Sequence, residues 1–234
     1  MGYRRWHESA RRVRTRAALM TGLCLVTAIG YAAPSKESAW RQTVRTFATS
    51  NFKNPAWGLS HSERDYALAS RLAASDHVVL DDDVLFAAAY LHDMAAFKPW
   101  EVEGKDHSDV GAMTIDSVLK GTSFPANKLE AVRGAIRTHM YYRTPVGPEA
   151  TYLHDADALD WLGAIGIARV LALADAHGQS PTLPDEIALI EKNMKEVPPH
   201  IVSSAGRSRI AARLAEDADF LKGLRSESDD FRSL

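Results

Sequence analysis

Leu85-Phe86-Ala87-Ala88-Ala89-Tyr90-Leu91-His92-Asp93 is an apolar run that ends in two polar residues. Three acids, Asp81 to Asp83, precede the run, and acidic side chains are favoured in the first turn of a helix. The stretch therefore predicts a helix that begins near Asp81 and closes with His92 and Asp93. Polar groups that such a helix turns inward are costly to bury without a partner, so this pair calls for a structural explanation.

The rest of the sequence also predicts helices. Gly and Pro divide it into short segments, and no period-2 alternation extends over five or more residues. Ser60, with Glu63 three residues later, predicts a capping box that begins a helix at His61. We expect an all-α fold of about eight or nine helices around one core. The expected helices cover residues 38–50, 61–73, 81–93, 107–119, 125–141, 150–173 (bent at Gly163 or Gly166), 186–195 and 204–224.

The first 33 residues differ from the rest of the chain. Six arginines lie among the first 16 residues, an apolar stretch follows from Ala17 to Ile29, and Gly30-Tyr31-Ala32 places small residues at its exit. This pattern predicts a signal peptide over residues 1–32. An uncleaved membrane anchor and an ordinary first helix are the alternatives. Cleavage implies a periplasmic or secreted protein, whereas an uncleaved segment implies a membrane-anchored one and is the only expected membrane contact.

Charge and cysteine content agree with export. Removing residues 1–32 takes away six arginines and one glutamate, so the net charge falls from −2 to −7. So acidic a domain is a poor candidate for nucleic-acid binding, which depends on Lys and Arg. The only cysteine, Cys24, lies in the removed segment, which leaves no thiol to mispair in an oxidising compartment.

Residue types that bind metals recur along the middle of the chain, in the order His61, His92, Asp93, His107, His139 and Asp157. Imidazole is the commonest metal ligand, and imidazole with carboxylate suits Zn, Mn, Fe or Ni. Singly, each has an ordinary explanation: His61 or His107 as a capping or surface residue, His139 as a favourable charge at a helix C-terminus. Their combined order favours a metal site assembled from several helices.

Two segments resemble a known family, the HD-domain superfamily of metal-dependent phosphohydrolases, whose signature is His…His-Asp…Asp. Residues 85–93 look like the family's apolar helix that ends in LLHD. A second run is similar to the DADRLDAIGAIGIAR stretch of a bacterial subfamily, and Ile136-Arg137-Thr138-His139 resembles the segment before it. That run is His154-Asp155-Ala156-Asp157-Ala158-Leu159-Asp160-Trp161-Leu162-Gly163-Ala164-Ile165-Gly166-Ile167-Ala168-Arg169. The resemblance covers roughly residues 57–175 and implies an HD-type domain over 57–224, after a helix and linker at 33–56 and before a polar tail at 225–234.

The resemblance also implies a ligand set. His61, His92, Asp93 and Asp157 match the four signature ligands, and His107 and His139 match the extra histidines of HD proteins that hold two metals. One or two divalent ions are implied: Mn, Mg, Ni, Co, Zn or Fe. The sequence departs from the family at three places, where Ala158 replaces an arginine, Met94-Ala95-Ala96 lacks a glycine, and Trp161 replaces a small residue.

The implied activity is cleavage of a small phosphorylated substrate, a phosphate ester or nucleotide, by metal-activated water. Asp93 is the candidate to bridge or orient the nucleophile, Arg64 and Lys98 are candidates to bind phosphate, and Asp160 is a candidate to orient a ligand. Arg143 is a further candidate for phosphate binding, and Lys105 is another for which solvated surface charge is the favoured interpretation. Two alternatives stay open: a di-iron oxygenase with the same fold, and a degenerate HD domain that binds a ligand without turnover.

Overall fold

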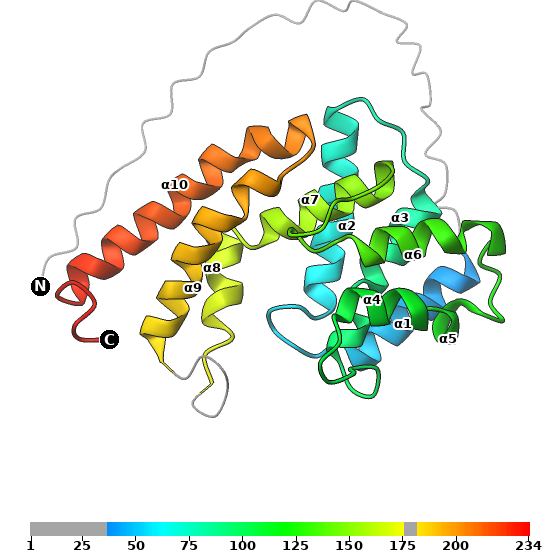
Figure 1. The fold of residues 1–234 in the computed structure, drawn as a ribbon, viewed down its shortest axis with the longest axis horizontal. Helices are drawn as coiled ribbons and strands as arrows, with labels where there is room; N and C mark the ends of the chain where they lie inside the picture. The colour runs from blue at the N-terminus through cyan, green and yellow to red at the C-terminus, as the bar shows by residue number, and fades with distance from the viewer. Residues whose placement is uncertain (1–36, 176–181) are drawn as a thin grey trace, which may run out of the picture. The chain divides into compact units, whose positions relative to one another are not determined.

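The computed structural model describes residues 37–175 and 182–234, and the predicted signal peptide over residues 1–32 lies outside them. The described residues contain helices and no strand, which confirms the all-α prediction (Figure 1). The helices are α1 (Ala39–Asn51), α2 (Leu59–Ser75), α3 (Asp82–Leu91), α4 (His107–Thr114), α5 (Asp116–Leu119), α6 (Leu129–Arg137), α7 (Pro148–Asp160), α8 (Gly163–Leu171), α9 (Leu183–Glu196) and α10 (Ser204–Glu227), with short 3-10 turns η1 (Met94–Ala96), η2 (Ala126–Lys128) and η3 (Pro198–His200). The α-helices of the described residues exceed the predicted eight or nine, because the predicted helices 107–119 and 150–173 are each broken into two helices.

The start of α2 differs from the prediction. Ser60 does not cap this helix, which begins at Leu59 with Gly58 as the N-cap. The turn before it sets this start, because the Asn54 side chain accepts hydrogen bonds from the backbone N–H groups of Ala56 and Trp57. A Cβ on Gly58 would lie 2.2 Å from the Asn54 carbonyl oxygen, so the turn closes only over a glycine. The predicted acidic start of α3 is confirmed: Asp81 accepts from the second and third N–H groups after it.

Helix α3 lies in the middle of the main core. All residues from Val84 to Leu91 are buried, and α3 packs against α1, α2, α6 and α7. Helices α2 and α7 lie side by side (Figure 1) and make extensive contact. Because α3 is surrounded by these helices, the two polar residues at its end are carried into the interior of the protein.

A second, smaller hydrophobic cluster corrects the expectation of one core. It joins α8, α9 and α10 through Ile167, Val170, Ile187, Ile190 and Leu221. The predicted polar tail is also corrected, since α10 continues to Glu227 and Phe231 packs back on this cluster. Within the described parts of the chain, no helix has the length and hydrophobicity to cross a membrane.

Candidate metal centre

The six predicted ligands converge, although they come from five separate segments. His61 lies in the first turn of α2, His92 and Asp93 follow α3, and His107 begins α4. His139 follows α6, which ends four residues before the predicted end near residue 141, and Asp157 lies on α7. Five of the six are buried, and the side chain of His107 is 27% exposed.

Asp93 lies at the centre of this cluster and faces two groups of ligands. Its Oδ2 is 3.5 Å from His61 Nε2 and 3.2 Å from His92 Nε2. Its Oδ1 is 3.3 Å from His107 Nε2 and 3.5 Å from His139 Nε2. Each oxygen of this carboxylate therefore lies close to a different pair of imidazoles.

Hydrogen bonds fix the tautomers of three imidazoles. The Nδ1 atom of His92 lies 2.9 Å from the Ala89 carbonyl oxygen, and that of His139 lies 2.6 Å from the carbonyl oxygen of Ile136. The Nδ1 atom of His61 lies 2.8 Å from a carboxylate oxygen of Asp160. These oxygens can only accept, so each Nδ1 donates, and in the neutral rings each Nε2 presents a lone pair to the cluster.

The spacing of these Nε2 atoms matches that of donors around a shared metal ion. His61 Nε2 and His92 Nε2 are 3.2 Å apart, and so are His107 Nε2 and His139 Nε2. Two facing lone pairs at this distance repel unless a proton or a metal ion lies between them. Donors that bind one ion at about 2.0–2.2 Å lie roughly 3.0–3.5 Å apart, which matches the spacing seen here.

Proton bridges do not satisfy this cluster. His61 Nε2 lies 3.1 Å from Asp65 Oδ2 and 3.2 Å from Asp157 Oδ1, and an Arg169 nitrogen, which can only donate, lies 3.3 Å away. A single proton on Nε2 can serve only one of the two carboxylates, whereas a metal ion can bind the imidazole and both carboxylates at once. The residues present therefore fit one or two divalent ions. Two overlapping groups suit a metal, His61–Asp65–His92–Asp157 and His92–Asp93–His139.

The pKa shifts in the metal-free cluster show how its histidines and aspartates influence one another. Burial and the charge of Arg169 lower the pKa of His61, but its contacts with Asp157 and Asp160 outweigh them, so the pKa is raised. Burial lowers the pKa of His139. For Asp93, burial raises the pKa, but the neighbouring histidines lower it well below the ordinary value. A proton on His61 competes with a metal for the same lone pair, so metal affinity should rise with pH.

Sequence reasoning missed two residues of this cluster. Asp65 lies one turn after His61 on α2, is fully buried, and forms part of the first group of donors. The signal was its i+4 spacing from His61, which puts both on one face of the helix. Arg169 on α8 is 97% buried, contacts Asp160 at 3.2 Å and lies over the Trp161 ring at 3.8 Å. It ends the quoted GAIGIAR segment, but nothing in the sequence located it beside His61.

The other predicted residues lie at varied distances from the cluster. Asp160 contacts His61 directly, as expected for an orienting group. Arg64 donates to Asp160 at 2.7 and 3.0 Å, so its guanidinium is held by a carboxylate. Lys98 is exposed and lines neither of the two pockets beside the cluster. Arg143 pairs with Asp106 and Asp109 at 2.8 and 2.9 Å.

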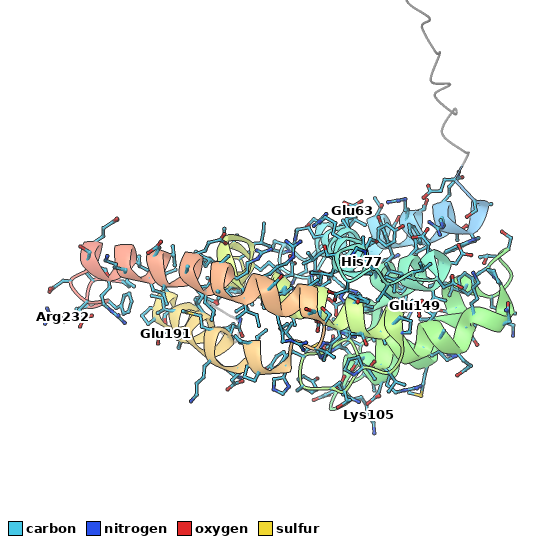
Figure 2. All side chains as sticks on the ribbon, turned by 90° about the horizontal axis from the view of Figure 1, so that it is seen from above. Glu63, His77, Lys105, Glu149, Glu191 and Arg232 are labelled. Atoms are coloured by element: carbon cyan, nitrogen blue, oxygen red, sulfur yellow. The ribbon has the colours of Figure 1, made fainter. Side chains whose placement is uncertain are left out.

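Lys105 lies in the loop before α4, and Figure 2 shows it on the opposite face of the molecule from Glu63 of α2. It lines the outer of the two pockets described below. Asp155, two residues before Asp157, accepts from the backbone N–H groups of Val202 and Ser203 at 2.9 and 2.6 Å. That carboxylate therefore ties α7 to the start of α10 and has a structural role.

A pocket of about 230 Å³ opens onto the cluster. Asp93, His107, Asp157 and Arg169 supply its polar lining, and Trp57, Ala96, Met140 and Trp161 supply its apolar wall. A second pocket of about 440 Å³ shares Trp57, Ala96 and His107 with it and continues over the loop at 101–106. Trp161 thus forms part of the pocket wall, at a position where the family usually has a small residue.

Comparisons with known proteins agree with this arrangement. Residues 58–162 match the model of the HD domain family. The solved structure of a predicted HD superfamily hydrolase from an uncultured Thermotogales bacterium is 26% identical, with a TM-score of 0.56, over 80% of this chain and 90% of that one.

Two further solved structures share the fold. Bacillus subtilis YpgQ in complex with ADP is 19% identical over 80% of this chain and 97% of that one, with a TM-score of 0.59. An HD-superfamily hydrolase from Bacillus thuringiensis is 21% identical over 81% of this chain and 96% of that one, with a TM-score of 0.58. No curated protein matches the chain. The family match over residues 58–162 and the fold shared with the solved structures make this chain similar to HD-superfamily proteins.

Proposed function

We propose that this protein is a metal-dependent phosphohydrolase that cleaves a small phosphate ester or a nucleotide. The observation that carries the proposal is the position of Asp93, whose two carboxylate oxygens each face a separate imidazole pair. His61, His92 and Asp157 would hold one ion with Asp93, and His107 and His139 would hold a second with the same carboxylate. Such ions lower the pKa of bound water toward 7 and neutralise phosphoryl oxygens.

The protein's own residues then position the substrate. Arg169 lines the pocket beside Asp93 and Asp157, and a guanidinium suits a phosphoryl group because it donates in a fixed, forked geometry. Arg64, the residue predicted for this role, does not line the pocket, so the role passes to Arg169. Asp160 holds His61 Nδ1 and contacts Arg169, so one carboxylate orients both a ligand and the phosphate-binding group.

The apolar wall of the pocket favours substrates with an aromatic or apolar leaving group. Trp57, Met140 and Trp161 exclude water from one side of the site and offer flat surfaces to an aromatic or apolar leaving group. The adjoining pocket provides room for a substrate larger than a phosphomonoester. The solved structure of YpgQ contains ADP, which supports including nucleotides among the substrates tested.

The test is a metal-reconstitution assay. The purified protein is stripped of metal, supplied with Mn, Mg, Ni, Co, Zn or Fe, and assayed with phosphomonoesters, phosphodiesters and nucleotides. We expect Asp93→Asn to lose activity by about 100-fold or more, as expected when a charge-stabilising group is removed. Asp155→Asn, an equally buried aspartate outside the cluster, is the matched control and should retain activity per folded molecule.

Equal phosphate release by wild type and Asp93→Asn would contradict the proposal. Oxygen consumption by the iron-loaded protein without phosphate release, together with a mixed-valence spin signal, would support the di-iron oxygenase instead. Ligand-induced stabilisation without any product would support the degenerate HD domain.

We also propose that residues 1–32 direct export and are removed, so that the mature protein works in the periplasm or outside the cell. The supporting observations are the basic start, the short apolar run and the small residues at its exit. Mass spectrometry of the purified protein should find a mature N-terminus near residue 33. An intact N-terminus in a membrane fraction would instead indicate an anchor.

A further inference from the structure

Asp65 is a buried carboxylate without a hydrogen-bond partner among the described residues. It is 0% exposed, and neither of its oxygens has a partner. Its Oδ2 lies 3.1 Å from His61 Nε2 and 3.7 Å from His92 Nε2. A carboxylate transferred from water into such a place is strongly disfavoured unless a positive charge compensates for it.

Neither of the two arginines near the cluster pairs with Asp65. Arg64 and Arg169 both contact Asp160, and Arg169 also donates to the Ala56 carbonyl oxygen and lies 3.3 Å from His61 Nε2. Four carboxylates lie in the cluster, those of Asp65, Asp93, Asp157 and Asp160, against these two guanidiniums. The ionised cluster is therefore left with two negative charges that only a bound cation or added protons can neutralise.

Geometry places Asp65 where a metal ligand belongs. Ligand atoms of His61, Asp65, His92 and Asp157 all lie within 4.8 Å of one another. With Oδ2 of Asp93, which is 3.2–3.5 Å from both imidazoles, the group offers two nitrogens and three oxygens. The other group offers two imidazoles and a single oxygen from Asp93.

We propose that Asp65 is a fifth protein ligand of the ion held by His61, His92, Asp93 and Asp157, and that it makes this position six-coordinate and selective for Mn²⁺ or Mg²⁺. Five protein donors leave one place for water or substrate. Zn²⁺ needs only four ligands and is satisfied by imidazole, whereas Mg²⁺ and Mn²⁺ favour six positions rich in oxygen. The inference deepens the proposed function and depends on its metal centre.

The test measures metal binding rather than activity. Metal-free wild type, Asp65→Asn and the control Asp155→Asn are titrated with Mn²⁺ by electron paramagnetic resonance of the free ion, and with Zn²⁺ by competition with a chromophoric chelator. Loss of groups that merely orient ligands weakens metal affinity about 10–100-fold. We expect Asp65→Asn to weaken Mn²⁺ binding at the tighter site by at least that much, and Zn²⁺ binding by much less.

A thermal melt of the metal-free proteins gives a second readout. Asp65→Asn should raise Tm, because an amide costs less than a carboxylate to bury without a hydrogen-bond donor, and the increase in Tm caused by Mn²⁺ should shrink. Asp155→Asn should lower Tm, because it weakens the acceptor of two backbone N–H groups, while leaving Mn²⁺ affinity unchanged.

The outcomes separate this inference from the proposed function. Wild-type Mn²⁺ affinity in Asp65→Asn would overturn the role of Asp65 and leave the metal centre intact. If wild type bound neither metal, the proposed function would fail as well. Should Asp65→Asn not fold, X-ray absorption of wild type loaded with one Mn²⁺ per chain decides the question: six donors, mostly oxygen, are expected, and a four-coordinate ion overturns the inference.

Discussion

Asp160 connects the candidate metal centre to the pocket, and its replacement by asparagine should destabilise the protein. Its side chain is 4% exposed and contacts His61 Nδ1 at 2.8 Å, Arg64 at 2.7 Å and Arg169 at 3.2 Å. Asp160→Asn keeps the shape but removes the charge. Arg169, only 3% exposed, then loses its counterion.

The magnitude follows from the burial of each partner. Breaking a buried ion pair by removing one member costs about 3–5 kcal/mol. Arg64 adds little, because its side chain is 31% exposed and solvent screens it. Because asparagine can still accept one hydrogen bond, we expect a loss of about 3 kcal/mol, a decrease in Tm of roughly 6–12 °C for a domain of this size. The freed His61 ring should weaken metal affinity about 10–100-fold.

A double-mutant cycle in urea isolates the pair. Asp160→Asn, Arg169→Met and the double variant are unfolded in the metal-free state at pH 7 and followed by circular dichroism. The double variant should be more stable than the sum of the single losses predicts, with a coupling energy of about 1–3 kcal/mol. A single-variant loss below about 0.5 kcal/mol, or strict additivity, would refute the argument that this pair is buried and coupled.

Three further predictions concern the fold and the ions. Chelation of metal present at about 100 times its Kd should lower the free energy of unfolding by about 2.7 kcal/mol, measured by urea melts with and without EDTA; unchanged melts would contradict a metal centre. Gly58→Ala should cost about 2 kcal/mol, because its Cβ would meet the Asn54 carbonyl oxygen at 2.2 Å; a wild-type Tm would show that the turn yields. Burial raises the pKa of Asp155, but hydrogen bonds from His154, Ser203 and Val202 lower the pKa by more than burial raises it, so the folded-state pKa lies below the ordinary value. The stabilisation that ionised Asp155 gives the fold, about 3 kcal/mol, should be complete above the unfolded pKa of about 3.9 and should be lost as pH falls through the folded pKa. Asp155→Ala should therefore resemble wild type in stability only in strong acid. A difference in Tm between the two proteins that does not change with pH would contradict this prediction.

Local signals located most helices but not all of their limits. Asp81 caps the helix that the acidic residues 81–83 predicted, because its side chain accepts from the N–H groups of Asp83 and Val84. Ser60 satisfied the same pattern and was wrong, since the preceding turn needs Gly58 against the Asn54 carbonyl oxygen. A capping pattern reports the chemistry of a few residues, whereas the start of α2 depends on how the incoming chain packs.

The sequence likewise predicted some residues of the candidate site and not others. The order of histidines and aspartates identified six residues that the fold brings together. Asp65 and Arg169 were missed because their importance depends on tertiary contacts. Asp65 resembles any polar residue on an amphipathic helix until α3 and α7 cover it. Arg169 reads as a surface arginine until α8 turns it against Asp160 and the Trp161 ring.

The ends of α3 and α6 orient the imidazole rings of His92 and His139. Each helix stops just before a ligand, and that ligand bonds through Nδ1 to the carbonyl three residues earlier: His92 to Ala89 and His139 to Ile136. Carbonyls in the last turn of a helix have no partner further along the helix, so the imidazole satisfies one of them and in return is held with Nε2 toward the ions. The Ile136 carbonyl also accepts from the backbone N–H of His139 at 3.5 Å, so it contacts both the backbone and the ring of the same residue. The end of this helix therefore supplies the candidate metal centre with an orienting acceptor for His139, the role that the carboxylate of Asp160 has for His61.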